Sequence, residues 1–294
     1  MNSFTFAHVS DLHLPFEPAL SLWQHFSKRQ LSVWSWRRRK VLHRPEILDA
    51  LASDLRSPDI EHVVVTGDLT NFSLPDEFRQ AARWLETLVP AARLSLVPGN
   101  HDALVPVVAT QGIDHLAPWM RAEAGWPTVH RHQGVTLIGL NSALPTAPLL
   151  AQGALGSDQL ARLEQLLREE GTAGRTRVVL LHHPVADGAV SWRKALRDRA
   201  GLQAVLRRVG AELILHGHAR DARLDSIAGP GAPIPCVCVP SSSAVPNPQD
   251  EGARWHRLCL YEEAGRKRLE VDVRRWTPQT QTFASTARYV LCLP

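Results

Sequence analysis

Five short polar motifs recur along the chain, and each follows an apolar run of the kind that forms a buried strand. In chain order they are Asp11-Leu12-His13, Gly67-Asp68, Gly99-Asn100-His101-Asp102, His182-His183-Pro184 and His216-Gly217-His218. Carboxylate, amide and imidazole donors at separate strand ends are typical of a divalent metal site built on an α/β sheet. Metal ions held by such ligands commonly promote the hydrolysis of phosphate esters. The motifs therefore predict metal-dependent ester chemistry.

The motifs differ in what each donor could contribute. Asp11 and His13 lie two apart in a segment that we expect to be extended, where residues i and i+2 point the same way, so both side chains can converge on one ion. Asp68 has two carboxylate oxygens and could bridge two ions. Taken singly, each residue has an ordinary structural explanation as a turn residue, a helix cap or a hydrogen-bonded core histidine. Jointly these explanations are weaker, because every motif falls at the end of a predicted strand, where α/β sheets bind their ligands.

Strands and helices alternate over most of the chain, and strands dominate its end. Apolar runs predict strands at 4–9, 60–66, 93–97, 136–140, 177–181, 212–215, 224–227, 234–239, 257–262 and 269–275. Helical periodicity appears at 45–56, 76–88, 157–170 and 200–209, with Ser157 as a candidate N-cap. Residues 15–44 look irregular, basic and rich in tryptophan. This order predicts two packed sheets with helices outside, in one domain spanning 1–294 with a strand-rich part from about 222.

The composition is that of an ordinary globular protein. The 294 residues are 44% hydrophobic and 21% charged, with a formal net charge of +4. A mild basic excess suits an anionic substrate and argues little for nucleic acid. The four cysteines lack CxxC spacing, so we expect reduced thiols and a cytoplasmic protein. The first apolar run reads as a core strand rather than a signal peptide, and no segment has the apolar length to cross a bilayer.

In their order and residue types, the motifs resemble the signature of the calcineurin-like metallophosphoesterases, which reads D-x-H, G-D, G-N-H-D/E, H and G-H-x-H. The match covers at least residues 4–220. Within that superfamily, Gly156-Ser157-Asp158-Gln159-Leu160 and the stretch from His182-His183-Pro184 to Ser191-Trp192 resemble class III cyclic-nucleotide phosphodiesterases. The resemblance implies an α/β fold of two packed mixed β-sheets flanked by helices, a four-layer α-β-β-α sandwich.

The resemblance also implies a role for each motif residue. The first metal would be held by Asp11, His13 and Asp68, and the second by Asp68, Asn100, His182 and His218. A hydroxide between the two ions would attack phosphorus in line. His101 would contact the phosphate and protonate the departing alkoxide, and Asp102 would orient His101 through a hydrogen bond. His183 and His216 would support the metal ligands without binding a metal themselves.

One position departs from the signature. The last motif reads Gly217-His218-Ala219-Arg220, so arginine replaces an imidazole that would ligate the first metal, and arginine is not a metal ligand. The first site could be weakened, with waters completing its shell, which is the interpretation we favour. Arg220 could instead serve a one-metal enzyme by supplying positive charge near the phosphate. Alternatively, Asp221 or His216 could fill the gap, or the protein could be a non-catalytic relative.

A basic, aromatic insert at about 16–44 would overhang the mouth of the site. Its segment 20–40 contains four large aromatic residues and six basic ones: Trp23, Phe26, Trp34 and Trp36, beside Lys28, Arg29, Arg37, Arg38, Arg39 and Lys40. It could be a solvated loop that packs on the body, a segment that binds an anionic membrane surface, or a lid that grips the substrate. Single-stranded nucleic acid is the least favoured partner.

Three functions follow from these observations. The favoured one is a phosphodiesterase that uses one or two divalent ions (Mn, Fe or Zn) and acts on a cyclic nucleotide or another small phosphodiester. The second is a peripheral hydrolase of a phospholipid or lipid pyrophosphate at the inner face of the membrane, which the insert suggests. The third is a non-catalytic binder of metal or phosphate, which Arg220 suggests. The sequence does not specify an oligomeric state.

Overall fold

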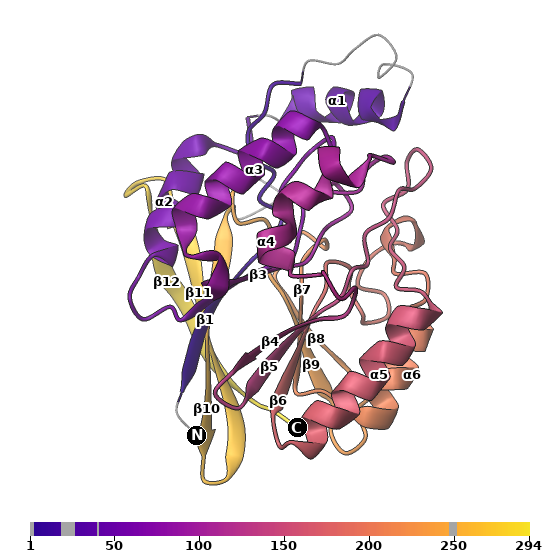
Figure 1. Cartoon of the computed structure of the whole chain (residues 1–294). Coiled ribbons are helices and arrows are strands. Elements are labelled where there is room, and N and C mark those ends of the chain that lie inside the picture. Colours follow the sequence, from indigo (N-terminus) through magenta and orange to yellow (C-terminus); the bar gives the residue numbers. More distant parts are fainter. Residues whose placement is uncertain (1–2, 19–26, 40, 247–251) are drawn as a thin grey trace.

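Two mixed six-stranded sheets pack face to face, with helices on their outer faces, in a computed structural model of the chain (Figure 1). The structure describes residues 3–18, 27–39, 41–246 and 252–294. The inner faces of both sheets share one apolar core, which includes Phe6 of the first sheet and Leu180 of the second. The predicted four-layer α-β-β-α sandwich is confirmed.

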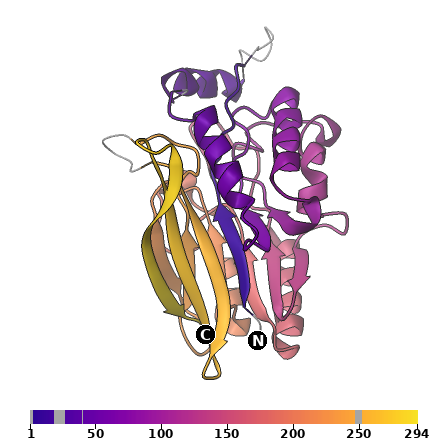
Figure 2. The same ribbon diagram turned by 90° about the vertical axis from the view of Figure 1, so that its left-hand side faces the viewer.

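The first sheet combines a parallel half with an antiparallel half. In spatial order its strands are β12 (Thr282–Cys292), β11 (Arg266–Thr277), β10 (Arg254–Glu263), β1 (Phe4–Val9), β2 (His62–Val65) and β3 (Leu94–Leu96). Strands β1, β2 and β3 run parallel, so their carboxyl ends meet at one edge. The antiparallel strands β10, β11 and β12 extend the sheet on the side of β1 opposite β2, where Figure 2 shows them as the yellow strands beside the indigo one.

The second sheet has a parallel centre between two antiparallel edge strands. Its order is β4 (Thr128–His132), β5 (Val135–Gly139), β6 (Thr176–Leu180), β7 (Leu213–His216), β9 (Ile234–Cys238) and β8 (Arg223–Ile227). Strands β5, β6, β7 and β9 are parallel. The strand-rich end of the chain therefore contributes to both sheets, because β8 and β9 join the second and β10 to β12 join the first.

Helices cover the outer face of each sheet. The α-helices are α1 (Lys28–Arg39), α2 (Pro45–Leu55), α3 (Pro75–Leu88), α4 (Ala117–Met120), α5 (Ser157–Thr172) and α6 (Arg199–Val209). Short 3-10 turns are η2 (Ala91–Arg93), η3 (Ala109–Gln111), η4 (Ile113–Leu116) and η5 (Trp192–Lys194). Helices α2, α3 and α4 pack on the first sheet, and α5 and α6 pack on the second. Figure 1 shows α1 beyond α3, at the end toward which β1 runs.

Most predicted elements are present, and the main differences are the following. Residues 28–39 form helix α1 rather than an irregular segment, because contacts with the body hold it in place. Strands β4 and β12 were not predicted. Ser157 does not cap α5: it is the first residue of the helix, after Gly156 at the N-cap, and its hydroxyl bonds Asp158 instead. In the described part of the chain, no helix combines the length and apolar character needed to cross a membrane.

Candidate metal centre

The polar motifs meet where the parallel strands of both sheets end. Asp11 follows β1, Asp68 follows β2 and Asn100 follows β3, while His182 and His218 follow β6 and β7. All five side chains are buried. Parallel strands deliver their loops to one edge of a sheet, and here the edges of two stacked sheets coincide. The five residues therefore lie at neighbouring strand ends of the two sheets.

Four donor atoms converge around His182. Its Nε2 atom lies 3.2 Å from Asn100 Oδ1, 3.1 Å from His218 Nδ1 and 3.4 Å from Asp68 Oδ2. The carboxylate of Asp68 and the two imidazoles offer ligand atoms that all lie within 4.8 Å of one another. Two imidazoles, a carboxylate and an amide oxygen form a donor set that suits a divalent transition metal.

In His182 and His218, the ring nitrogen that points away from the cluster forms a hydrogen bond, and this bond determines which nitrogen is unprotonated in the neutral ring. His182 Nδ1 lies 2.6 Å from the carbonyl oxygen of Thr66, and His218 Nε2 lies 3.0 Å from the carbonyl oxygen of Lys194. A carbonyl oxygen only accepts, so these nitrogens carry the proton and the facing nitrogens present lone pairs. The neutral cluster therefore consists of lone pairs pointed at one another without a proton between them, an arrangement that fits a cation.

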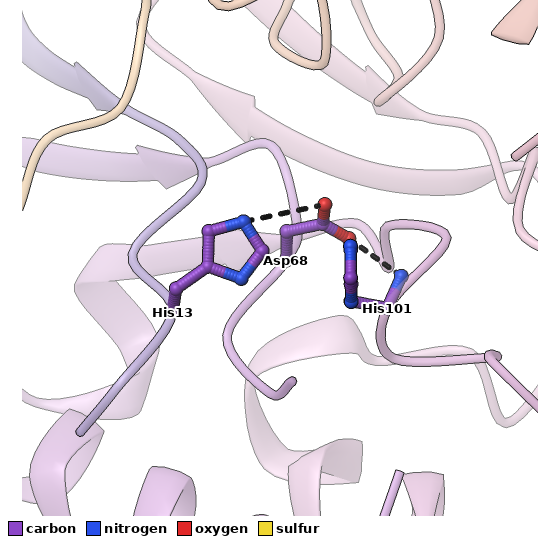
Figure 3. A group of neighbouring side chains, drawn as sticks. All are labelled: His13, Asp68 and His101. Carbon is purple, nitrogen blue, oxygen red and sulfur yellow. Dashed lines mark hydrogen bonds and ion pairs between the residues drawn. The ribbon is translucent and has the colours of Figure 1, made fainter. Parts of the chain in front are cut away.

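A second group of ligand atoms shares Asp68 with the first. His13, Asp68 and His101 also offer ligand atoms within 4.8 Å of one another, and Asp68 belongs to both groups. Figure 3 shows His13 Nε2 facing one oxygen of Asp68, at 3.8 Å, while the backbone N–H of His101 donates to the other at 2.7 Å. The rings of His13 and His101 are held at Nδ1 by the carbonyl oxygens of Thr70 and Asn71. His13 Nε2 and His182 Nε2 both face Oδ2 of Asp68, so Asp68 is the residue that joins the two groups.

The loops that carry Asp68 and Asn100 approach too closely for side chains. Gly67 has φ +95°, and a Cβ atom there would overlap the backbone of Gly99. A Cβ atom at Gly99 would in turn overlap the carboxylate of Asp68. Glycine is required at both positions, because it allows the left-handed turn and the close approach of the two backbones.

The family model of the calcineurin-like phosphoesterases matches residues 4–219. The chain belongs to this calcineurin-like phosphoesterase family. No curated protein sequence matches the chain. The range agrees with the extent of the motif resemblance, so the family predicted from the motifs is confirmed.

Solved structures share the fold of this calcineurin-like phosphoesterase at low sequence identity. A dimetal phosphatase from Danio rerio superposes with a TM-score of 0.60 at 13% identity, covering 99% of each chain. A purple acid phosphatase from yellow lupin (Lupinus luteus) seeds also gives a TM-score of 0.60 at 13% identity, covering 99% of this chain and 54% of the other. For a 5′-nucleotidase precursor from Thermus thermophilus the values are 0.51 and 14%, with 99% and 55% covered.

Electrostatic coupling around Asp68 is strong. Burial alone would raise the pKa of Asp68, but the imidazoles of His182, His101 and His13 outweigh it and hold that pKa well below the usual range. Burial likewise opposes protonation of His182, yet the carboxylates of Asp68 and Asp11 raise its pKa to about 9. The carboxylates thus favour positive charge at His182 Nε2, which a proton or a bound cation could supply.

Asp102 acts differently from our expectation. Its Oδ2 atom accepts hydrogen bonds from the backbone N–H groups of Asp68 and Gly99, both at 2.9 Å. Its Oδ1 atom accepts from the backbone N–H and the hydroxyl of Thr70. The ring of His101 is held by Asn71 instead. Asp102 therefore fixes the backbone of the two loops that carry Asp68 and Asn100, and the predicted bond that orients His101 is not the one formed.

The first motif also departs from expectation. Asp11 and His13 have φ of +51° and +41°, so the loop is left-handed at both residues rather than extended. Asp11 Oδ2 accepts hydrogen bonds from the hydroxyl of Ser10 and the backbone N–H of His218. Among the described residues, Asp11 belongs to neither of the two ligand groups. Its place as a ligand of the first metal remains a proposal.

The serine segment 241–243 supports the first loop and was missed by sequence reasoning. The hydroxyl of Ser241 donates to the carbonyl oxygen of Asp11, and that of Ser243 donates to the carbonyl oxygen of Leu12. Ser242 exchanges backbone and hydroxyl bonds with Ser10. The run of three serines after β9 was the available signal, but it reads as an ordinary turn.

Arg220 stands where the signature has its final imidazole, and Asp221 and His216 are the alternatives for that place. Arg220 is exposed on the turn after His218, with φ +66°, and Asp221 is also exposed. His216 is buried, and its Nδ1 atom bonds the carbonyl oxygen of Gly217. Within the described ranges, none of the three belongs to a ligand group, whereas His101 does. His183 bonds Ser142 and Ala151 behind His182, as expected for a supporting residue.

The basic insert is fastened over the strand ends by its first two cations. Lys28 Nζ donates to Thr146 Oγ1 and to the carbonyl oxygen of Leu150, both in the loop after β5. Arg29 donates to the carbonyl oxygens of Phe72 and Ser73, which follow β2. Helix α1 thus bridges loops of the two sheets beside the metal centre. Of the predicted insert, Trp23, Phe26 and Lys40 lie outside the described residues.

Proposed function

We propose that this protein hydrolyses a small phosphodiester, with a cyclic nucleotide as the favoured substrate class. The observation that carries the proposal is the pair of ligand groups that share Asp68. When bound there, divalent ions would lower the pKa of a water molecule and neutralise charge on the phosphoryl oxygens. Asp11, His13 and Asp68 would hold the first ion, and Asp68, Asn100, His182 and His218 would hold the second.

The chain's own groups supply orientation and proton transfer. His101 keeps Nδ1 on the carbonyl oxygen of Asn71, so its Nε2 faces the ligand group and can act on the phosphate or the leaving group. Asp102 keeps the loops of Asp68 and Gly99 in register, which fixes the geometry of both ligand groups. The preference for a diester depends on the likeness of 156–160 and 182–192 to class III phosphodiesterases.

The proposal is tested with bis(p-nitrophenyl) phosphate as the diester and p-nitrophenyl phosphate as the monoester, each with added Mn²⁺. We expect turnover of the diester to exceed that of the monoester. Asp68→Ala should abolish both activities, because both ligand groups lose their shared carboxylate. Asp114→Ala, at an exposed position in η4, is the matched control. Faster monoester turnover would reject the diester preference, and turnover unchanged in Asp68→Ala would reject the enzyme assignment.

A further inference from the structure

Large apolar side chains are exposed on three segments around the metal centre. Trp34 and Leu31 lie on α1 and are 65% and 44% exposed, Leu149 lies in the loop after β5 and is 75% exposed, and Trp192 lies in η5 and is 67% exposed. We call these four residues the apolar rim. Isolated exposed apolar residues are normal, but several on adjoining segments mark an interaction surface.

Hydrogen bonds join the three segments into one surface. Lys28 at the start of α1 donates to the carbonyl oxygen of Leu150, next to Leu149. The backbone N–H of Ala151 donates to the carbonyl oxygen of Arg193 at 2.8 Å, and Gln152 Nε2 donates to that of Trp192 at 2.9 Å. Hydrogen bonds therefore connect α1 to the loop after β5, and that loop to η5.

The same segments are attached to the metal centre. The carbonyl oxygen of Lys194 in η5 accepts from His218 Nε2. Arg29 in α1 binds the carbonyl oxygens of Phe72 and Ser73, in the loop that begins with Asp68. Figures 1 and 2 both show α1 at the end of the molecule toward which β1 runs, where the metal ligands lie. A surface that covers the rim would also face the metal centre.

The orientation of α1 is fixed by its inner face. Val33 and Trp36 are buried in a small cluster with Phe72 and Leu74, and the rings of Trp36 and Phe72 are 5.8 Å apart. Leu31 and Trp34 are three residues apart and so share a face of the helix, on the side away from Val33 and Trp36. Packing of the inner face holds the two exposed side chains outward.

The charged residues of 18–45 and 188–197 are all basic, whereas 143–157 has no charged residue. No aspartate or glutamate occurs in 18–45, 143–157 or 188–197. The basic residues of the three segments are Lys28, Arg29, Arg37, Arg38, Arg39, Lys40, Arg44, Arg193, Lys194 and Arg197. The guanidinium group of Arg193 also lies 5.7 Å from the ring of Trp192. Tryptophan and leucine among cations are the composition of protein surfaces that enter the headgroup region of anionic bilayers.

We propose that the apolar rim docks this protein on an anionic lipid surface, with the metal centre facing the bilayer. The exposed tryptophans and leucines would enter the headgroup layer, while the basic residues of the same sequence segments favour anionic lipids. Within the phosphodiester class proposed above, docking would then favour an amphipathic phosphodiester that reaches the metals from the membrane surface over a water-soluble cyclic nucleotide. This substrate class rests on the proposed phosphoesterase function, whereas the docking does not.

The test is sedimentation with phosphatidylcholine vesicles, with and without phosphatidylglycerol. We expect binding only when phosphatidylglycerol is present, and weaker binding as salt is added. Leu31→Ser/Trp34→Ser and Trp192→Ser should each lower the partition coefficient by about tenfold. The matched control is Leu224→Ser, because Leu224 is 50% exposed on the edge strand β8, outside the rim. It should bind within about twofold of the natural protein.

Several outcomes would overturn the docking proposal. They are absence of binding to the anionic vesicles, equal loss of binding in Leu224→Ser, and equally tight, rim-dependent binding to single-stranded DNA or polyglutamate. Turnover of soluble bis(p-nitrophenyl) phosphate separates the two proposals. Rim-dependent vesicle binding without any turnover would retain the docking and reject the hydrolase. Turnover in the natural protein and in all rim variants, without vesicle binding by the natural protein, would retain the hydrolase and reject the docking.

Discussion

The Nδ1 atom of His182 lies 2.6 Å from the backbone carbonyl oxygen of Thr66, so a histidine after β6 is oriented by the strand end of β2 in the other sheet. This bond determines that His182 Nε2, and not Nδ1, faces Asp68 and Asn100. The ligand set therefore spans the interface between the sheets. Its geometry depends on how the two sheets pack, and neither sheet would form it alone.

Asp102→Asn should weaken the fold and the metal centre together. The amide that replaces one oxygen would turn N–H groups toward backbone N–H donors of Asp68, Gly99 or Thr70. We expect a loss of about 2 kcal/mol in the free energy of unfolding and a loss of roughly 10–100-fold in metal affinity. Urea unfolding and metal titration measure the two effects. Asp114→Asn, at an exposed position in η4, should change neither.

The sequence could predict where the ligands lie but not how their side chains are oriented. Strand ends are visible as apolar runs, and the polar residue after each run has a side chain suited to one chemistry. The groups that hold the imidazoles are backbone carbonyls of Thr66, Thr70, Asn71 and Lys194. Every residue has a carbonyl oxygen, so no residue type marks these positions.

Helix α1 was missed for a different physical reason. Its buried side is narrow, because Val33 and Trp36 supply the apolar contacts while Arg29 bonds carbonyl oxygens of the body. A segment with so few apolar residues lacks the stripe that identifies a helix in the sequence. Short helices gain most of their stability from tertiary packing, which local periodicity does not report. Strand β12 is similar, since most of its side chains are exposed.

Stability should fall as pH rises through the titration of Glu77. Burial raises the pKa of this carboxyl from its usual 4.5 to about 7, although the backbone N–H groups of Leu74, Asn71 and Phe72 oppose the shift. Below about pH 4.5, Glu77 is protonated in both states and its stabilising contribution is fully present. Between about pH 4.5 and 7 the unfolded chain ionises first, so about 3 kcal/mol is lost.

Urea unfolding across this pH range checks the sign and size of the effect. Glu77→Gln should remove the downward slope that Glu77 causes, because glutamine does not titrate. Glu86→Gln, at an exposed position on the same helix α3, should retain the slope of the natural protein. If the free energy of unfolding of Glu77→Gln depends on pH as steeply as that of the natural protein, Glu77 is already ionised in the folded protein throughout the range.

Arg220→His should restore the signature's final imidazole. The residue follows His218 by two positions and has φ +66°, a conformation that histidine tolerates better than most side chains. If the first site is only weakened, the variant should hold more metal per chain and reach full activity at a lower Mn²⁺ concentration. Metal analysis and a Mn²⁺ titration of turnover measure this. Lost activity without added metal would favour a direct role of Arg220 at the phosphate.

His101 provides the sharpest separation between a proton donor and a ligand. As a donor, it should be dispensable when the leaving group is already acidic, so His101→Asn should slow bis(p-nitrophenyl) phosphate hydrolysis by at most about tenfold. Esters of poorly acidic alcohols should lose about 10²–10⁴-fold, with no change in the number of bound ions. The alternative is that His101 binds a metal ion, because it shares a ligand group with His13 and Asp68. Loss of one ion in His101→Asn, with a rate loss that does not depend on the leaving group, would make His101 the ligand that replaces the missing imidazole.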